Sequence, residues 1–331
     1  KDILVNENGL LLQGDAGKGK TYVAKKIASC LDRVKKLAPT NKASLNLKGS
    51  TIHKYLNLDA NGYISTKRLN TIKKTIDYLI IDEISMISKD IWDKLVFVKQ
   101  ATGVKFLLLG DDKQLPPVEC ESIKDYFNHP AVKYLCNNNR NILQVVKRYN
   151  LELKKVLDDI DNIDVSVFPF VENKINIAYT NKTRKIVNKK WNEELKTDNA
   201  LFLECDDDEK SQDMWIYEGL PIICKKNDGK GGEYLNNETF VVDNFDDKNI
   251  YISNERINDD DEIYTHKMVV KIEDMMSLFY LNYCTTIHKI QGTTIREPFT
   301  IWDWDNKYMG IKARYTALSR AVCLQHISIV R

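Results

Sequence analysis

The chain has 331 residues, of which 43% are hydrophobic, and its formal net charge is +2. This length allows two domains of ordinary size. No run of about 18 apolar residues predicts a membrane span, and the small charge excludes a polycation that binds nucleic acid over its whole surface. The cysteines form no C-x-x-C pair, which favours reduced thiols and an intracellular setting. Without a long apolar run, we expect no membrane partner.

The first expected strand, residues 9–13, leads into a glycine-rich loop. The octapeptide GDAGKGKT fits the phosphate-binding pattern G-x-x-x-x-G-K-[ST], and a helix with apolar spacing follows over 21–31. We expect Lys20 to reach the β- and γ-phosphates of a nucleoside triphosphate and the Thr21 hydroxyl to bind Mg²⁺. The predicted nucleotide-binding residues of this loop are Gly14, Ala16, Gly17, Lys18, Gly19, Lys20 and Thr21.

Buried strands are also expected at 34–38, 78–81 and 104–109, with a short helix at 41–47. Alternating strands and helices predict a parallel sheet covered by helices on both faces, an α/β fold. The second and third of these strands end in polar groups, Asp82-Glu83 and the segment 110–114. Ligands bind at the carboxyl edge of such sheets, so these groups and the glycine-rich loop should converge on one nucleotide.

The acidic pair and a nearby glutamine have chemistry suited to hydrolysis. Adjacent carboxylates favour a positive partner, and we expect Mg²⁺ on Asp82, with Glu83 orienting or deprotonating water. The amide of Gln114 can hydrogen-bond the γ-phosphate and that water. Arg140 and Arg320 are candidate phosphate clamps from a second domain, although Arg320 alone could equally be a surface residue.

Residues 57–76 interrupt this alternation of strands and helices. Asn61-Gly62 between two short apolar pieces predicts a small β-hairpin that protrudes from the first domain. Tyr63, beside the predicted turn, either stacks on a base or packs the hairpin onto its own domain.

A second alternation of strands and helices begins near residue 140, with a strand at 175–179 and a helix at 183–195. Residues 214–283 are rich in short β-like pieces and predict an inserted β-barrel. The αβ pattern returns from residue 285 to the end. Thr-Ile-His-Lys occurs at both 51–54 and 286–289, an echo that proves nothing by itself.

The ordered motifs resemble those of the superfamily 1 helicases, and most closely the 5′→3′ branch, superfamily 1B, of the RecD, Dda and PIF-like type. The resemblance covers essentially the whole chain. It rests on GDAGKGKT, LAPTNKA (37–43), STIHKYL (50–56), LIIDEISMI (79–87), GDDKQLPPV (110–118), Arg140, YTNKT (179–183), TTIHKIQGTT (285–294) and YTALSRA (315–321).

This resemblance implies two RecA-like domains in tandem with ATP between them. The first would comprise 1–56 and 77–139, with 57–76 as a strand-separating hairpin. The second would comprise 140–213 and 284–331, with 214–283 as an SH3-like insertion. By motif match, the catalytic residues are Lys20, Glu83, Gln114, Arg140 and Arg320, the metal ligands are Thr21 and Asp82, and Gly292 joins the nucleotide site. The implied nucleic-acid contacts are Thr40, Asn41, Lys42, Thr51, His53, Thr180, Asn181, Thr286, His288 and Lys289, and the predicted hairpin adds Tyr63.

The implied activity is an ATP- and Mg²⁺-dependent helicase that moves 5′→3′ on single-stranded DNA and opens duplex junctions. Two alternatives stay open, a viral-type RNA helicase and an ATP-switched nucleic-acid clamp that does not unwind. The family's adenine-binding glutamine would precede the residues present, and Thr293-Thr294 stand where the family often has an acidic residue. We expect the chain to be a fragment of a larger replication or repair protein, and its residue usage suggests a viral origin.

Overall fold

The structure, a computed structural model, describes residues 1–59, 61–117, 125–205, 211–228, 233–258 and 262–330. The chain divides into two compact units, Lys1–Ile160 with Gly292–Thr294, and Asp161–Gln291 with Ile295–Arg331. The predicted boundary at residue 140 is too early, because a strand that begins there joins the first unit's sheet.

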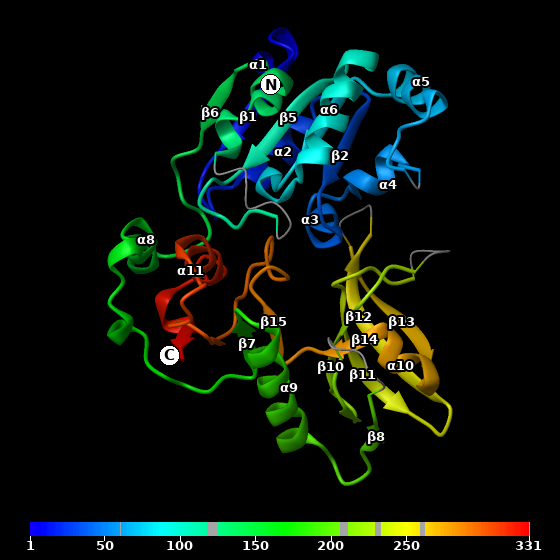
Figure 1. The fold of residues 1–331 in the computed structure, drawn as a ribbon, viewed down its shortest axis with the longest axis vertical. Helices are drawn as coiled ribbons and strands as arrows, with labels where there is room; N and C mark the ends of the chain where they lie inside the picture. The colour runs from blue at the N-terminus through cyan, green and yellow to red at the C-terminus, as the bar shows by residue number, and fades with distance from the viewer. Residues whose placement is uncertain (60, 118–124, 206–210, 229–232, 259–261, 331) are drawn as a thin grey trace. The chain divides into compact units, whose positions relative to one another are not determined.

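The first unit contains a six-stranded sheet, all of whose pairings are parallel (Figure 1). Its strand order is β3-β2-β4-β5-β1-β6. In chain order the strands are β1 (Gly9–Gln13), β2 (Val34–Ala38), β3 (Ser50–Thr51), β4 (Tyr78–Ile81), β5 (Lys105–Gly110) and β6 (Arg140–Ile142). The parallel sheet that the sequence predicts is therefore confirmed.

Both faces of this sheet are buried because its strands are apolar on both sides. In β1, Leu11 contributes to one core cluster with Phe106 of β5, whereas Leu10 and Leu12 contribute to the other. Trp92 packs in the first cluster and Leu4 in the second. The helices of this unit are α1 (Asp2–Asn6), α2 (Lys20–Ala28), α3 (Asn41–Asn46), α4 (Ile52–Leu56), α5 (Thr66–Thr75), α6 (Lys89–Thr102), α7 (Pro130–Leu135) and α8 (Leu151–Asp158).

The β-hairpin predicted at 57–76 is wrong: the described residues of this segment form a turn followed by helix α5. The carboxylate of Asp59 accepts hydrogen bonds from the backbone N–H groups of Asn61 and Tyr63, both at 2.9 Å. Ser65 then caps α5 by accepting a bond from the N–H of Arg68. The Asn-Gly turn is thus present, but a helix cap follows it in place of a second strand.

The second unit contains a four-stranded parallel sheet in the order β15-β7-β16-β17. Its strands are β7 (Ile175–Ala178), β15 (Cys284–Thr286), β16 (Phe299–Ile301) and β17 (Ile327–Ile329), and the helices are α9 (Asn181–Leu195) and α11 (Ile311–Leu318). A separate antiparallel pair is formed by β8 (Leu201–Leu203) and β9 (Met214–Ile216). The predicted strand and helix at 175–195 are confirmed.

The β-rich region contains a five-stranded antiparallel sheet in the order β13-β12-β11-β10-β14 (Figure 1). The strands are β10 (Pro221–Cys224), β11 (Thr239–Phe245), β12 (Asn249–Ile257), β13 (Ile263–Lys271) and β14 (Phe279–Leu281). Helix α10 (Ile272–Leu278), which the sequence pattern did not predict, joins the last two strands. The described pairings give an open strand order, and the SH3-like barrel stays a prediction.

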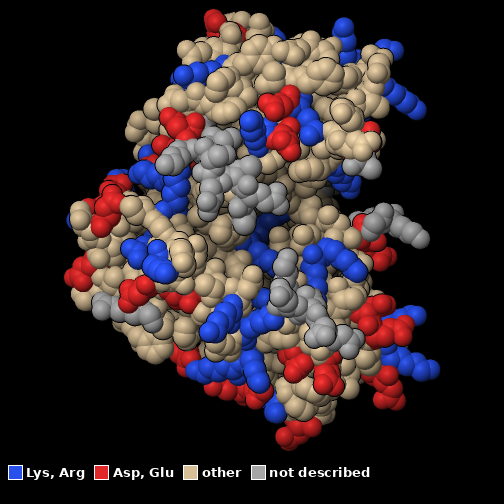
Figure 2. All heavy atoms as spheres, in the orientation of Figure 1, with Lys and Arg blue, Asp and Glu red and all other residues tan. Residues whose placement is uncertain are grey.

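Single 3₁₀ turns complete the secondary structure: η1 (Ile84–Met86), η2 (Tyr126–Asn128), η3 (Ile160–Asn162), η4 (Val165–Val167) and η5 (Leu324–His326). Within the described ranges, no helix has the length and apolar character needed to cross a bilayer. Figure 2 shows Lys and Arg side chains interspersed with Asp and Glu over the visible surface, in keeping with the small net charge.

Candidate nucleotide and nucleic-acid site

The glycine-rich loop joins β1 to α2, as predicted. Gly17 and Gly19 have φ angles of 75° and 77°, which residues with a Cβ adopt only at a cost in free energy. Gly19 is the N-cap of α2, so the first backbone N–H groups of the helix point into the loop. The Lys20 ammonium donates to the carbonyl oxygens of Gly14 (2.6 Å) and Asp15 (3.1 Å), and its side chain is buried. A buried ammonium group beside the free N–H groups of a helix N-terminus is suited to bind an anion.

The two predicted metal ligands lie in contact. The Thr21 hydroxyl on α2 donates to Asp82 Oδ2 at 2.6 Å, although the two residues are 61 positions apart in the chain. Asp82 is buried at the end of β4, and its other oxygen accepts a bond from the N–H of Glu83 at 2.8 Å. A hydroxyl and a carboxylate oxygen are the hard ligands that Mg²⁺ prefers, so this pair fits the predicted ion.

Glu83 adopts left-handed backbone angles, φ 53° and ψ 47°. Such strain in a residue other than glycine is concentrated at functional sites. The segment 292–294 belongs to the same unit, and Asn46 donates to the carbonyl of Gly292 at 2.8 Å. A Cβ added to Gly292 would lie 3.8 Å from Glu83 Oε1, so this glycine is beside the predicted catalytic carboxylate.

Gln114 follows β5 and is 3% exposed. Its amide nitrogen donates to Asp111 Oδ2 at 3.0 Å, which fixes the side chain. The amide oxygen is buried and, among the residues that the structure describes, has no hydrogen-bond partner. A buried acceptor of this kind is suited to hold a water molecule or a ligand group.

Sequence reasoning missed the segment that lies against the glycine-rich loop after β6. The N–H of Lys147 donates to the Gly17 carbonyl at 2.8 Å. A Cβ on Gly17 would lie 2.6 Å from Arg148 Cβ and 3.0 Å from the Tyr149 ring. Burial raises the pKa of the Tyr149 phenol, and the nearby carboxylate of Asp15 raises it further. The positive φ and this close approach together require glycine at position 17.

Arg140, the predicted clamp, has a different set of contacts. It starts β6 opposite Leu11, and its guanidinium donates to the Phe127 carbonyl and, at 3.1 Å, to Asn128 Oδ1. These bonds tie β6 to η2. The arginine that the structure brings to the glycine-rich loop is Arg148, for which no local pattern in the sequence gave a signal.

Arg320 lies in the second unit, directly after α11, and is 1% exposed. Its Nε donates to the Thr316 carbonyl and its Nη2 to Ser319 Oγ, both at 2.9 Å. A buried guanidinium held by two such bonds is a fixed positive charge, unlike a surface arginine.

The first unit's predicted nucleic-acid contacts include two helix N-caps. Thr40 accepts from the N–H of Ala43 at 3.2 Å to cap α3, and Thr51 accepts from that of Lys54 at 3.3 Å to cap α4. Strands β2 and β3 pair side by side, so both caps lie at the same edge of the sheet. On these helices, Asn41 and Lys42 are half-buried and His53 is exposed. Tyr63, which precedes α5, is 71% exposed.

The second unit's predicted contacts are similarly placed at strand and helix ends. Thr180 caps α9 and donates its hydroxyl to Asp303 at 3.0 Å, while Asn181 Oδ1 accepts from Arg184 Nε at 3.1 Å. Thr286 ends β15, and Lys289 lies in the turn that follows.

The two Thr-Ile-His-Lys copies share a local structure. In each, the threonine ends a strand, and the isoleucine, Ile52 or Ile287, is almost wholly buried. The next two residues then fall in a turn or short helix, where burial lowers the pKa of His288. The sequence echo therefore corresponds to a repeated local structure.

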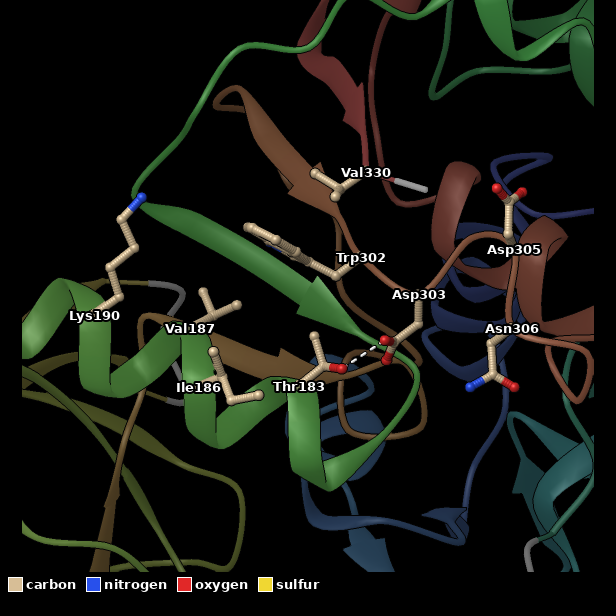
Figure 3. A pocket seen from close by; sticks show the side chains of 9 residues that line it. All are labelled: Thr183, Ile186, Val187, Lys190, Trp302, Asp303, Asp305, Asn306 and Val330. Carbon is tan, nitrogen blue, oxygen red and sulfur yellow. Dashed lines mark hydrogen bonds between the residues drawn. The ribbon is translucent and has the colours of Figure 1, made fainter.

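A pocket of about 440 Å³ lies beside α9 in the second unit (Figure 3). Trp302 and Val187 form part of its apolar wall, and the Thr183 hydroxyl donates to Asp303 at 2.5 Å within it. None of the residues predicted to bind nucleotide or nucleic acid lines this pocket.

Comparison with known proteins gives consistent matches. A family model described as an AAA domain matches residues 2–141. The ATP-dependent DNA helicase Pif1 of Campylobacter jejuni is 28% identical over 398 residues, which cover 96% of this chain and 88% of that protein. The ATP-dependent DNA helicase PIF1 of Xenopus laevis is 29% identical over 143 residues, 38% of this chain and 22% of that protein.

Solved structures share the fold over nearly the whole chain. Pif1 helicase from Bacteroides in complex with ADP-AlF3 and ssDNA superposes with a TM-score of 0.70 at 22% identity, covering 98% of this chain and 89% of that one. Pif1 helicase from Candida albicans gives 0.71 at 18% identity, covering 99% and 92%. At these identities the likeness concerns the fold, here two tandem RecA-like domains.

Proposed function

Since this chain belongs to the Pif1-like branch of the superfamily 1B helicases, we propose that it is an ATP-dependent DNA helicase that moves 5′→3′ on single-stranded DNA. The observation that carries this proposal is the convergence at one edge of the first sheet. Lys20 follows β1, Asp82 and Glu83 follow β4, and Gln114 follows β5. Phosphate binding, metal binding and water activation are thus available in one place.

In this proposal each residue has a separate task. Lys20 holds the β- and γ-phosphates, in place of the loop carbonyls that it contacts here. Thr21 and Asp82 would hold Mg²⁺, and the ion would neutralise charge on the phosphate oxygens. Glu83 takes a proton from the attacking water, and the buried Gln114 oxygen accepts that water's other hydrogen.

Two arginines supply further charge. We assign Arg320 to the transferring phosphoryl group, because its guanidinium is buried and held by two hydrogen bonds. Arg148 is a better candidate than Arg140 for a second clamp, since its Cβ approaches the glycine-rich loop while Arg140 is bonded to the η2 segment.

The nucleic-acid path would follow the repeated motif. His53 and Lys289 lie in the two Thr-Ile-His-Lys copies, one in each unit. Single-strand binding through lysine side chains such as that of Lys289 should weaken with salt, with log K falling by about 0.7 for each phosphate contact against log salt.

The test is a strand-separation assay on short duplexes that carry a 5′ tail, a 3′ tail or an RNA tail, with ATPase measured in parallel. We expect unwinding of the 5′-tailed DNA only. Preferential unwinding of the RNA-tailed substrate would point to an RNA helicase, and DNA-stimulated ATPase without unwinding would point to a clamp.

Matched variants separate binding from hydrolysis. Lys20→Ala and Glu83→Gln should each lower DNA-stimulated ATPase by a factor of at least about 100, from lost phosphate stabilisation and lost water activation. Lys20→Ala should also weaken nucleotide binding, whereas Glu83→Gln should retain it. Near wild-type turnover in either variant would contradict the assignment.

A further inference from the structure

Tyr280 of β14 lies at the centre of a group of cations in the second unit. The Lys225 and Lys289 ammonium groups lie 4.4 and 4.6 Å from its ring centroid, and the Arg184 guanidinium carbon lies 5.1 Å away. We call these four residues the Tyr280 cluster. The cations come from three separate elements: the start of α9, the segment after β10, and the turn after β15.

The cations of this cluster are held together by the protein. Two ammonium groups at 4.4 and 4.6 Å from one centroid lie within about 9 Å of each other, less than a Debye length of about 10 Å at 0.1 M salt. They therefore repel one another. Lys225 is anchored by donating to Ser211 Oγ and the Met276 carbonyl, and the aromatic ring offsets part of the repulsion through its negative face.

Positions that gather like charges against their repulsion are suited to a multivalent anion. One member, Lys289, and the residue that Arg184 contacts, Asn181, are already predicted to hold nucleic acid. Two other members, Lys225 directly after β10 and Tyr280 on β14, extend this predicted surface to the five-stranded sheet.

We infer that the Tyr280 cluster binds a backbone phosphodiester of the single strand, with Lys225 as a phosphate contact and Tyr280 as the residue that positions the cations. This inference rests on the proposed function but assigns the Lys225 contact to the β-rich insertion, outside the helicase motifs quoted from the sequence. Lys225, Lys289 and Tyr280 are each only partly buried, so a strand can reach them.

The test measures binding of a fluorescein-labelled dT16 oligonucleotide to the full chain at several NaCl concentrations. Lys225→Ala should reduce the slope of log K against log salt by about 0.7 and weaken binding about fivefold at 0.1 M salt, the loss expected for one phosphate contact. Lys226→Ala is the matched control, because Lys226 is the exposed next residue and is outside the cluster. It should leave both quantities unchanged.

Further variants separate charge from structure. Lys225→Arg keeps the charge and should keep the slope even if the anchoring bonds change. Tyr280→Phe should bind as the wild type does, whereas Tyr280→Leu should weaken binding several-fold with an unchanged slope, because the cations remain but lose their shared ring.

Three results would overturn the inference. Two concern the variants: a Lys225→Ala slope equal to that of Lys226→Ala in a protein that melts normally, or equal losses for Tyr280→Phe and Tyr280→Leu. Failure of the wild type to bind the oligonucleotide at all would instead count against the proposed function. Inorganic phosphate serves as a competitor of the oligonucleotide. If both bound with the same salt dependence and without preference for the oligonucleotide, the cluster would be a general anion site, and this result would also overturn the inference.

Discussion

Gly17 and Gly19 form a matched pair for testing how the glycine-rich loop is held. Both have φ near 75°, so an alanine at either position costs about 1–2 kcal/mol of backbone strain. Only at Gly17 would the new Cβ also collide, at 2.6 Å from Arg148 Cβ, whereas nothing lies within 4 Å of a Cβ at Gly19. Overpacking of this kind adds about 1–3 kcal/mol.

The additional free-energy cost in Gly17→Ala should destabilise the contact between the glycine-rich loop and Arg148. The Lys147 N–H donates to the Gly17 carbonyl, so its amide exchange reports on the contact between the loop and the segment after β6. A loss of about 1–3 kcal/mol in Gly17→Ala corresponds to roughly 5- to 150-fold faster exchange, while Gly19→Ala should change it by less than about threefold. Hydrogen-exchange mass spectrometry of nucleotide-free protein measures both. Equal acceleration in the two variants would refute the reasoning.

Three further predictions concern single side chains. Arg320→Lys should lower kcat by about 10³-fold or more with nearly unchanged nucleotide affinity, because an ammonium cannot reproduce the guanidinium fork. Arg314→Lys, on the helix α11 that precedes Arg320, is the control. Burial lowers the pKa of His288 below its usual 6.5, so protonation favours the unfolded chain. The stability of the folded chain should therefore fall as the pH drops below about 6.5. Between pH 7.5 and 5.5, the urea midpoint of His288→Asn should fall less than that of the wild type. Tyr63→Ala should slow unwinding of a 5′-tailed duplex at least about fivefold while DNA-stimulated ATPase stays constant, and an unchanged rate would leave Tyr63 with no part in strand separation.

The first sheet and the meeting of polar residues at its edge could be predicted because the information is local. The strands 9–13, 34–38 and 78–81 have the predicted bounds, since each is a short run between turn or polar residues. The carboxyl ends of parallel strands must meet at one edge of a sheet, so the sequence alone could predict that Thr21 and Asp82 lie together.

The errors arose where local signals competed or where the contact is long-range. Asn61-Gly62 is a hairpin signal, but the Ser65 cap and the burial of Ile72 on α5 favour a helix after the turn. Helix α10 follows directly on a β-rich run, without a break in the apolar pattern. The approach of Arg148 to Gly17 depends on the path of the chain after β6, which no window of sequence contains.

The open strand order of the five-stranded sheet bears on how the protein behaves at high concentration. Strand β13, nine residues long, lies at the end of that order, and its Ile263 and Val269 are exposed. An edge of this kind is a template for pairing with a strand of another molecule. Lys267 and Lys271 lie on the same strand, and charged side chains at an edge oppose such pairing. We therefore expect self-association through strand pairing to begin at this edge, and we expect these two lysines to oppose it.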